Sequence, residues 1–494
     1  MGRTDSRIVQ KQYFERMLLT SVAILRAQER KAVANRGGVP FAQEVLSLVQ
    51  QRIRLREERM SDDIEARTMR RVYWRLIPFL FLLLVVNYLD RVNIGFAALR
   101  MNADLGLSAT AFGFGASIFF VGYALFEVPS NLILHKVGAR VWIARILVSW
   151  GLVSGCMAFV QGETSFYILR FLLGVAEGGF LPGIVYYLTQ WFPIEHRSKA
   201  NSGVVAATAV ASVVGSPLSG AILTYMPEVL GLRSWQWMFL VEAIPAVLLG
   251  IAVLFWLTER PETADWLPAD EKAWLARRLR EEESLTATQG DLPFWRVARL
   301  GRVWALAALF TCFLTAFYGV LLWLPQIVKA FGGLTDVAVG LLSALPFLCG
   351  ATAMLLWGRH SDRKRERKWH LAAALSLGGL GLLGSAYAPD KLASFACLCV
   401  AAAGIWGGLG IFWSLTGDFL SGGARAAGIA LINTLAQLGG LIGPWMTGVV
   451  RDWAGSFTAA LAALACFAFL AALIAALLND RLATSEPTSK TVVA

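Results

Sequence analysis

The segment LIPFLFLLLVVNYLDRVNIGFAAL, residues 76–99, decides the fold class of this chain. About 20 predominantly apolar residues are enough for a helix to cross a hydrocarbon core of roughly 30 Å. Similar runs recur through the 494 residues, of which 56% are hydrophobic and only 16% are charged. This composition excludes an ordinary soluble enzyme and predicts an all-α membrane protein.

Twelve such runs predict twelve transmembrane helices in two six-helix halves. We expect them near residues 76–99, 108–134, 140–160, 164–190, 201–225, 236–258, 303–329, 336–357, 369–388, 392–416, 422–448 and 456–478. Because twelve is even, both termini lie on one side. The connections on that side carry most of the loop cations, as in 259–302 and 358–368, which by the positive-inside rule makes it the cytoplasm. A multi-pass protein of the inner membrane explains most of the net charge of +11, and no nucleic acid is expected as a partner.

The segment 259–302 is polar and divides the spans six and six. We therefore predict an N-terminal half at 71–258, a cytoplasmic central loop at 259–302 with a helix beginning near Pro268, and a C-terminal half at 303–480. We expect residues 1–70 to form a cytoplasmic extension and 481–494 a cytoplasmic tail. Residues 1–59 are either a dispensable extension or the product of a start codon assigned too early. The loop GRHSDRKRERK, residues 358–368, is partly repeated at 131–140, as expected of a transporter built from repeats.

Two pairs of an acid and a base lie deep inside predicted spans. Asp90 and Arg91 lie in the first span, and Arg170 and Glu177, seven residues apart and so on roughly one helix face, lie in the fourth. A charge at the bilayer centre costs about 2.5 to 3.5 kcal/mol on insertion scales, so these residues indicate a functional cavity. Arginine binds a carboxylate through two parallel hydrogen bonds, and a buried acid can carry a proton. The alternative is structural, with pairs such as Asp90 and Arg170 neutralising each other to fix helix packing.

Further polar residues lie in other spans. Glu127 and Asp418 are expected to pair with loop cations and hold a closed gate, together with the loop residues Asp362 and Arg363. The predicted substrate contacts, besides the two arginines, are Tyr88, Tyr318, Asn433 and Gln437. The amides could instead bond neighbouring helices. Glu242, early in the sixth span, is assigned no role.

Several strings, in order, resemble the anion:cation symporter family of the major facilitator superfamily: NYLDRVNIGFA, GYALFEVPSNLILHKVGAR, RFLLGVAEGGFLPG, YYLTQWFPIEHRSKA, YGVLLWLPQIVK and ARAAGIALINTLAQLGGLIGP. Members import organic anions such as tartrate, phthalate, hydroxyphenylacetate, nicotinate and hexonates together with protons. The resemblance implies proton coupling at Asp90 and substrate binding at Arg91, and it matches the family's fourth-span pair to Arg170 and Glu177. Family members place an Asn where Gln437 stands, and hexonate importers place a Gln in the fifth span, where this chain has Thr208 and Ser212. That departure favours an aromatic or less hydroxylated carboxylate.

The sequence therefore predicts a proton-coupled secondary transporter that imports a small organic anion by alternating access, with Asp90 and Glu177 carrying protons. It needs no cofactor or metal and functions as a monomer. An exchanger or facilitator of the same fold without proton coupling is the nearest alternative, and a receptor with a transporter fold is a further one. A membrane enzyme or an ATP-driven pump is disfavoured because no HExxH, GxSxG, CxxC or GxxxxGK[ST] motif is present.

Overall fold

The computed structural model describes residues 39–287, 294–419 and 425–478, which are helical almost throughout. Residues 1–38 and the predicted tail at 481–494 lie outside the described part. Within these described ranges, twelve helical segments are long and apolar enough to cross a membrane, which confirms the predicted fold class. They are Asp63–Leu105, Ala109–Val137, Ala139–Phe159, Glu163–Thr189, Ile194–Tyr225, Ser234–Trp256, Gly301–Lys329, Asp336–Lys364, Lys368–Tyr387, Lys391–Phe419, Ala427–Ala454 and Phe457–Leu477.

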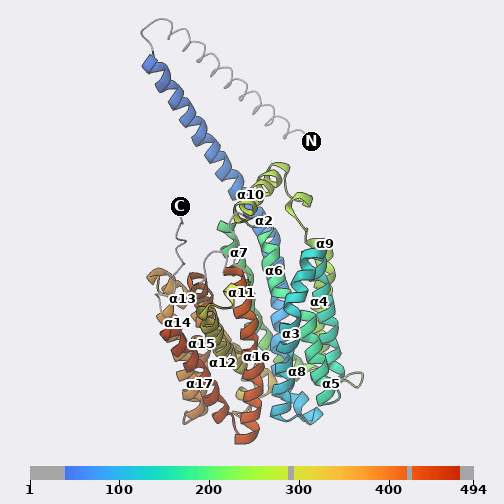
Figure 1. The fold of residues 1–494 in the computed structure, drawn as a ribbon. Coiled ribbons are helices and arrows are strands. Elements are labelled where there is room, and N and C mark those ends of the chain that lie inside the picture. Colours follow the sequence, from blue (N-terminus) through green and yellow to red (C-terminus); the bar gives the residue numbers. More distant parts are fainter. Residues whose placement is uncertain (1–38, 288–293, 420–424, 479–494) are drawn as a thin grey trace. The chain divides into compact units, whose positions relative to one another are not determined.

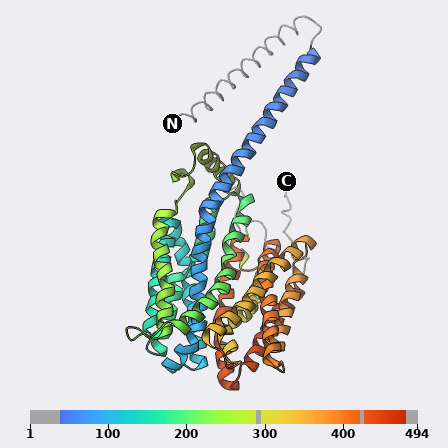
Figure 2. The same ribbon diagram turned by 180° about the vertical axis from the view of Figure 1, so that it is seen from behind.

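The individual helices follow the predicted order. The first half contains α2 (Val39–Leu105), α3 (Ala109–Val137), α4 (Ala139–Cys156), α5 (Glu163–Glu177), α6 (Phe180–Thr189), α7 (Ile194–Val205), α8 (Ala207–Tyr225) and α9 (Ser234–Trp256). The second contains α12 (Gly301–Lys329), α13 (Asp336–Lys364), α14 (Lys368–Tyr387), α15 (Lys391–Phe419), α16 (Arg425–Ala454) and α17 (Phe457–Leu477). In Figures 1 and 2 the cyan to green helices α3–α9 and the yellow to red helices α12–α17 form two adjacent groups.

The described residues fall into two compact units. One takes the described residues up to Arg71 together with Leu267–Leu275, and within it Arg71 Nε lies 3.1 Å from Glu271 Oε2. The other takes the rest, including all the membrane-length helices from Val72 onward. Helix α10 (Ala269–Ala287) begins directly after Pro268, as predicted from the proline and the acidic residues that follow it. The short helix α11 (Phe294–Val297) precedes α12.

The fourth predicted span is two helices rather than one. Helix α5 ends at Glu177, and α6 begins at Phe180 after Gly178 and Gly179. Gly179 has φ of +90° in the left-handed region, which costs a residue with a Cβ about 1–2 kcal/mol. A Cβ there would also lie 2.4 Å from Ser130 Oγ. The break fixes where the side chain of Glu177 projects.

The two halves meet through equivalent helices. Helix α3, second in its half, packs on α16, and α13, second in the other half, packs on α8. Both α3 and α13 begin with similar sequences, GLSATAFG at 106–113 and GLTDVAVG at 333–340, and the Ser108 and Thr335 side chains cap them in the same way. This repeat relates the two halves more clearly than the loop motif at 358–368 does.

Each crossing depends on glycines at matching positions. A Cβ on Gly113 would lie 2.6 Å from the carbonyl oxygen of Pro444, and one on Gly340 would lie 2.5 Å from that of Ser216. Likewise, a Cβ on Gly448 would lie 2.2 Å from the carbonyl oxygen of Ala109 on α3, and one on Gly220 would lie 2.6 Å from that of Asp336 on α13. The backbones can approach this closely only because no side chain stands between them.

Polar groups close both crossings at the end of the bundle where α3 and α13 begin. Asp452 of α16 accepts hydrogen bonds from the backbone N–H of Ala109 at 3.2 Å and of Thr110 at 2.7 Å. At the equivalent place, Thr224 Oγ1 of α8 accepts from the N–H of Val337 at 2.9 Å. We call these two contacts the helix-start latches. They tie the first half to the second at this end.

Candidate functional site

Arg91 of α2 and Glu177 of α5 form an ion pair inside the bundle. Their side chains are 11% and 2% exposed. Helices α3 and α5 approach closely beside the pair: a Cβ on Gly174 would lie 2.0 Å from the carbonyl oxygen of Phe119, and one on Gly122 would lie 2.3 Å from that of Phe171. Glu177 is the last residue of α5, and it meets Arg91 of α2 there.

Aromatic rings surround the Arg91 guanidinium. Its carbon lies 5.1 Å from the ring centre of Tyr88, 5.4 Å from that of Phe119 and 5.7 Å from that of Tyr123. Each cation–π contact contributes about 0.5–2 kcal/mol, depending on how far it is desolvated. Arg91 also donates to the hydroxyl of Tyr318 on α12 at 3.5 Å. Arg91 therefore contacts both halves of the protein.

One donor of Arg91 has no partner. Its Nε is buried and makes no hydrogen bond, whereas its two terminal nitrogens bond Glu177 and Tyr318. A buried N–H without an acceptor is unfavourable by about 1–3 kcal/mol. An incoming carboxylate could bond this donor and could displace Glu177 from the same guanidinium.

Arg170 also contacts the ring of Phe119. It is 3% exposed, and its guanidinium is 5.0 Å from the centre of the Phe119 ring. Its Nε and Nη2 donate to the carbonyl oxygens of Gly115 and Ala116 on α3, both at 3.3 Å. Among the described residues no carboxylate forms an ion pair with Arg170, so the structural pairing with Asp90 that the sequence left open is not seen. Both arginines of the predicted site thus flank one ring.

Among the described residues Asp90 forms no ion pair with either of these arginines. Neighbouring residues of an α-helix project about 100° apart, so Asp90 points away from the face that carries Arg91. Its carboxylate accepts from Trp150 Nε1 at 2.8 Å, from Asn93 Nδ2 at 3.2 Å and from the Ser154 hydroxyl. The predicted set of four ionisable residues is therefore divided in this structure into a cluster around Arg91 and a separate cluster around Asp90. Sequence reasoning missed Trp150 and Ser154, although they lie one turn apart on the same helix.

Glu127 and Asn433 bond each other across the two halves. Asn433 Nδ2 of α16 donates to Glu127 Oε1 of α3 at 2.9 Å, and the other carboxyl oxygen of Glu127 is buried without a partner. The expectation that Glu127 pairs with a loop cation is thus not met here, because α16 supplies an amide instead. Gln437, one turn further along α16, is half-buried.

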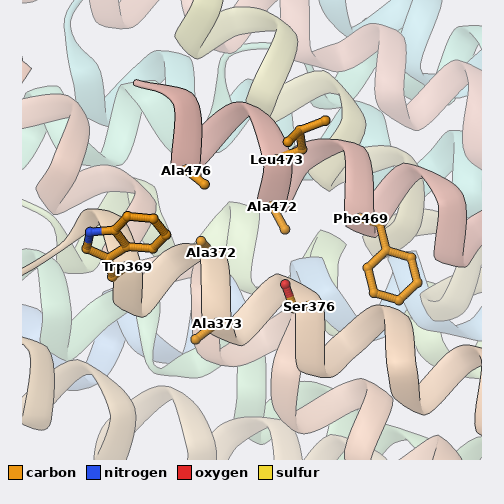
Figure 3. Close-up of a pocket in the computed structure, with 8 residues that line it drawn as sticks. All are labelled: Trp369, Ala372, Ala373, Ser376, Phe469, Ala472, Leu473 and Ala476. Carbon is orange, nitrogen blue, oxygen red and sulfur yellow. The ribbon is translucent and has the colours of Figure 1, made fainter. Parts of the chain in front are cut away.

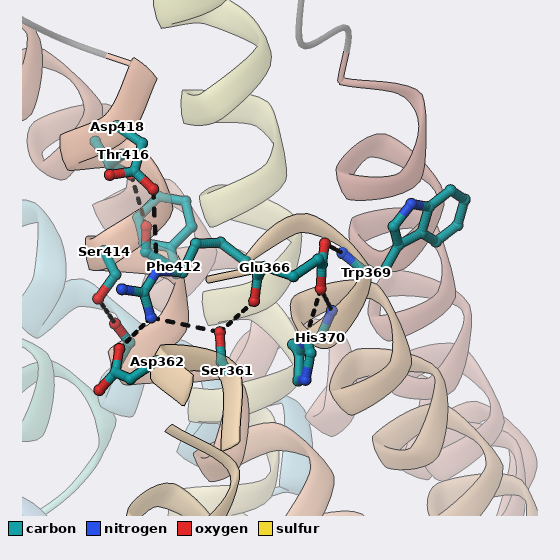
Figure 4. Close-up of polar contacts among 11 residues, drawn as sticks. Ser361, Asp362, Glu366, Trp369, His370, Phe412, Ser414, Thr416 and Asp418 are labelled. Carbon is teal, nitrogen blue, oxygen red and sulfur yellow. Dashed lines mark hydrogen bonds and ion pairs between the residues drawn. The ribbon is translucent and has the colours of Figure 1, made fainter. Parts of the chain in front are cut away.

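Two of the predicted gate residues, Asp362 and Asp418, lie near the turn between α13 and α14 (Figure 4). Arg367 forms an ion pair with Asp362, and its Nε lies 3.9 Å from Asp418 Oδ2 on α15. Arg363, which the sequence favoured, is exposed at the end of α13. The left-handed conformation of Arg365, with φ of +52°, turns the chain so that Arg367 takes this place.

Glu366 in the same turn caps the start of α14. It accepts from the backbone N–H of Trp369 at 2.6 Å and of His370 at 3.1 Å, and it pairs with the His370 ring. Partial burial acts to raise the pKa of Glu366, but these donors outweigh it and hold the pKa below its usual value. The turn is therefore fixed by charge as well as by backbone geometry.

A hollow between α14 and α17 has none of the predicted site residues in its lining (Figure 3). Its lining is apolar except for Ser376, and includes Ala372, Ala472, Leu473 and the exposed Trp369. None of its lining residues carries a charge. It is therefore a poor site for a polar substrate.

Twelve membrane-length helices in two equivalent halves, with a buried ion pair where the halves meet, define a secondary transporter of small organic molecules. The chain belongs to the Major Facilitator Superfamily, whose family model matches residues 80–444 and 333–492 in two overlapping segments. These findings confirm the resemblance noted from the sequence and establish a transporter rather than an enzyme.

Relatives span nearly the whole chain. A protein of Agrobacterium vitis named "Putative tartrate transporter" is 49% identical over 428 residues, which are 87% of this chain and 94% of that protein. A "Quinolone resistance transporter" of Acinetobacter baumannii is 41% identical over 400 residues, 81% of this chain and 92% of that protein. Among solved structures, a D-xylose-proton symporter has the same fold, with a TM-score of 0.64 and 18% identity over 81% of this chain and 97% of its own.

Proposed function

We propose that this protein imports a small organic anion, a carboxylate, across the inner membrane together with protons. The observation that carries the proposal is the Arg91 guanidinium, which bonds a carboxylate of its own half, reaches Tyr318 of the other half and keeps one buried donor without a partner. The name of the Agrobacterium vitis relative supports a hydroxylated or other small dicarboxylate as the substrate class.

The proposed mechanism is an exchange of partners on Arg91. A proton that binds Glu177 neutralises its carboxylate and removes the charge that holds Arg91. The guanidinium then binds the substrate carboxylate through two hydrogen bonds. Arg170, on the same Phe119 ring, supplies a second positive charge near the anion. Asp90 acts as a further proton carrier, separated from the arginines by the helix face it occupies.

Alternating access follows from the two halves, here taken as residues 71–258 and 303–480, rocking about this site. In this proposal both termini and the connection at 259–302 are cytoplasmic, and the turn around Arg367, Asp362 and Asp418 is part of the cytoplasmic gate. Asn433, Gln437, Tyr88 and Tyr318 line the substrate path, with Glu127 coupling the halves through Asn433. The monomer is the working unit.

Uptake by proteoliposomes tests the proposal. Labelled tartrate, phthalate, hydroxyphenylacetate, nicotinate and galactonate are offered with and without an inward proton gradient. We expect one of them to accumulate only with the gradient, and Asp90→Asn and Glu177→Gln to lose that accumulation. Equal uptake of an anion without the gradient, undisturbed by both substitutions, would instead favour an exchanger or facilitator of the same fold.

A further inference from the structure

Glu242 is a buried carboxyl group of α9 that the mechanism above does not use. It is 5% exposed, and Ser219 Oγ of α8 donates to its Oε1 at 2.8 Å. Its Oε2 is buried and has no hydrogen-bond partner. No ion pair of the described residues includes Glu242. A carboxylate without a cation loses far more hydration on burial than one hydroxyl donor returns, so these surroundings suit a neutral acid.

Asp90 is a buried carboxyl with the opposite surroundings. It is 4% exposed but accepts three hydrogen bonds. The indole of Trp150 and the amide nitrogen of Asn93 can only donate, so these partners suit an ionised carboxylate. Arg170 on α5 acts on Asp90 as a favourable charge without forming an ion pair. Of the two carboxyl groups, Asp90 is therefore the anion and Glu242 the acid.

The amide of Asn93 lies between the two carboxyl groups. Its nitrogen donates to Asp90 Oδ1, and the same side chain is a neighbour of Glu242. Its oxygen, like Glu242 Oε2, is a buried acceptor without a partner. The cluster thus lacks donors, and a proton on Glu242 supplies one. The ionisable side chain that acts on Glu242 is Asp90 of α2. Helix α8 faces Glu242 with the hydroxyl of Ser219. Helix α4 faces the cluster with Trp150 and Ser154, which bond Asp90.

We propose that Glu242 is a further proton-binding residue, and that Glu242, Asn93 and Asp90 form one site that holds a single proton between two carboxyl groups. In this conformation the proton is on Glu242. Its transfer to Asp90 leaves Glu242 as the carboxylate and Asp90 as the acid, so the cluster keeps one negative charge. The transfer requires Trp150 and Asn93 to release Asp90, because neither can accept a proton from it. Proton movement is therefore tied to movement of α4 against α2.

Infrared difference spectroscopy of the full chain in lipid tests the protonation directly and needs no transport. Because Glu127 is another buried acid, the comparison is wild type minus Glu242→Gln at neutral pH. We expect the difference to contain the carbonyl band of a protonated carboxyl group. Carboxylate bands in its place would overturn the proposal.

The sharing of one proton has its own spectroscopic test. Replacing Asp90 by Asn removes the neighbouring negative charge, which favours ionisation of Glu242. The pH at which the Glu242 carbonyl band disappears should then fall by about one unit or more relative to the wild type. An unchanged pH would show that the two carboxyl groups do not share a site. Glu127→Gln, which removes a buried acid bonded to Asn433 rather than to this cluster, is the matched control.

The role in coupling rests on the proposed function and is measured separately. Glu242→Gln should lose accumulation driven by a proton gradient but retain counterflow of the substrate, which needs no net proton movement. Gradient-driven uptake equal to that of the wild type would overturn the coupling role. If the wild type itself shows no proton-driven uptake, the proposed function fails, while the infrared comparisons still decide whether Glu242 and Asp90 share a proton.

Discussion

Replacing Asp452 by Ala should loosen one helix-start latch. The carboxylate accepts from two backbone N–H groups at the beginning of α3, at 3.2 and 2.7 Å. Removing a comparable side-chain cap costs about 0.5–2 kcal/mol, and an acidic group at a helix start contributes about 0.3–1 kcal/mol. Because the Asp452 side chain is 35% exposed, solvent weakens both effects. We expect a loss of about 1 kcal/mol from the state in which α3 and α16 are closed, a shift of about fivefold in its population.

The assay is a distance measurement between spin labels in lipid. Ala103 and Ala454 are exposed at this end, one in each half, and can be replaced by labelled cysteines after the six native cysteines are removed. The long-distance population should grow in Asp452→Ala and grow less in Asp452→Asn, which keeps one acceptor oxygen. Thr224→Val is the matched variant at the other crossing and should have a smaller effect, because it removes one neutral hydrogen bond.

The two latches lie on different helix pairs, so their effects should add in the double variant. Identical distance distributions for the wild type, Asp452→Ala and the double variant would refute the reasoning, since they would show that other contacts, such as the glycine crossings and the Arg100–Asp336 ion pair, hold this end closed.

Three further outcomes are expected. Tyr318→Phe removes only a long hydrogen bond of 3.5 Å to Arg91, so the KM for the transported anion should rise no more than about twofold, and a tenfold rise would mean that the hydroxyl binds substrate directly. Gly179→Ala should destabilise the protein by about 1–2 kcal/mol because of the positive φ, and this loss should be seen as a lower melting temperature in detergent. An unchanged melting temperature would contradict the reasoning. Gly231 also has a positive φ but is not next to a transport residue, so Gly231→Ala is the control for strain alone. Glu366→Gln should lower the melting temperature at neutral pH, and the difference should disappear in acid: the pKa of Glu366 is lowered in the folded chain, so its stabilisation is present above the unfolded value of about 4.3 and is lost as the pH falls through the folded value. A difference that persists below that range would mean that the carboxylate charge is not responsible.

Much of the fold was predictable because membrane spans are recognised from one local property, the length of a continuous apolar run. Runs such as 76–99 must be helical to satisfy their backbone in lipid, whatever they pack against. The repeat at 106–113 and 333–340 was also present in the sequence, but its meaning depends on Gly113 and Gly340 reaching backbone atoms far along the chain. Which helices cross at those glycines is a tertiary fact that no local pattern contains.

The site was predictable as a set of residues but not as an arrangement. Helical geometry already requires Asp90 and Arg91 to face different directions. It does not say that Asp90 meets Trp150 or that Arg170 meets backbone carbonyls of α3, because both outcomes depend on which neighbouring helix faces each side chain. Arg367 was missed for a similar reason, since the left-handed turn at Arg365 redirects the chain after Arg363.

The matched crossings have a consequence for how such a protein can diverge after gene duplication. At both crossings the glycines leave room for nothing larger than hydrogen, so the two copies must keep the same backbone frame. Elsewhere the copies are free to differ, as the acidic cap at Asp452 and the neutral cap at Thr224 already show. The first half carries the buried Arg91–Glu177 pair and Glu127, while the other offers Tyr318 and Asn433 to them. Because the backbone packing at the crossings is kept, the side chains of each half can change without a matching change in the other half.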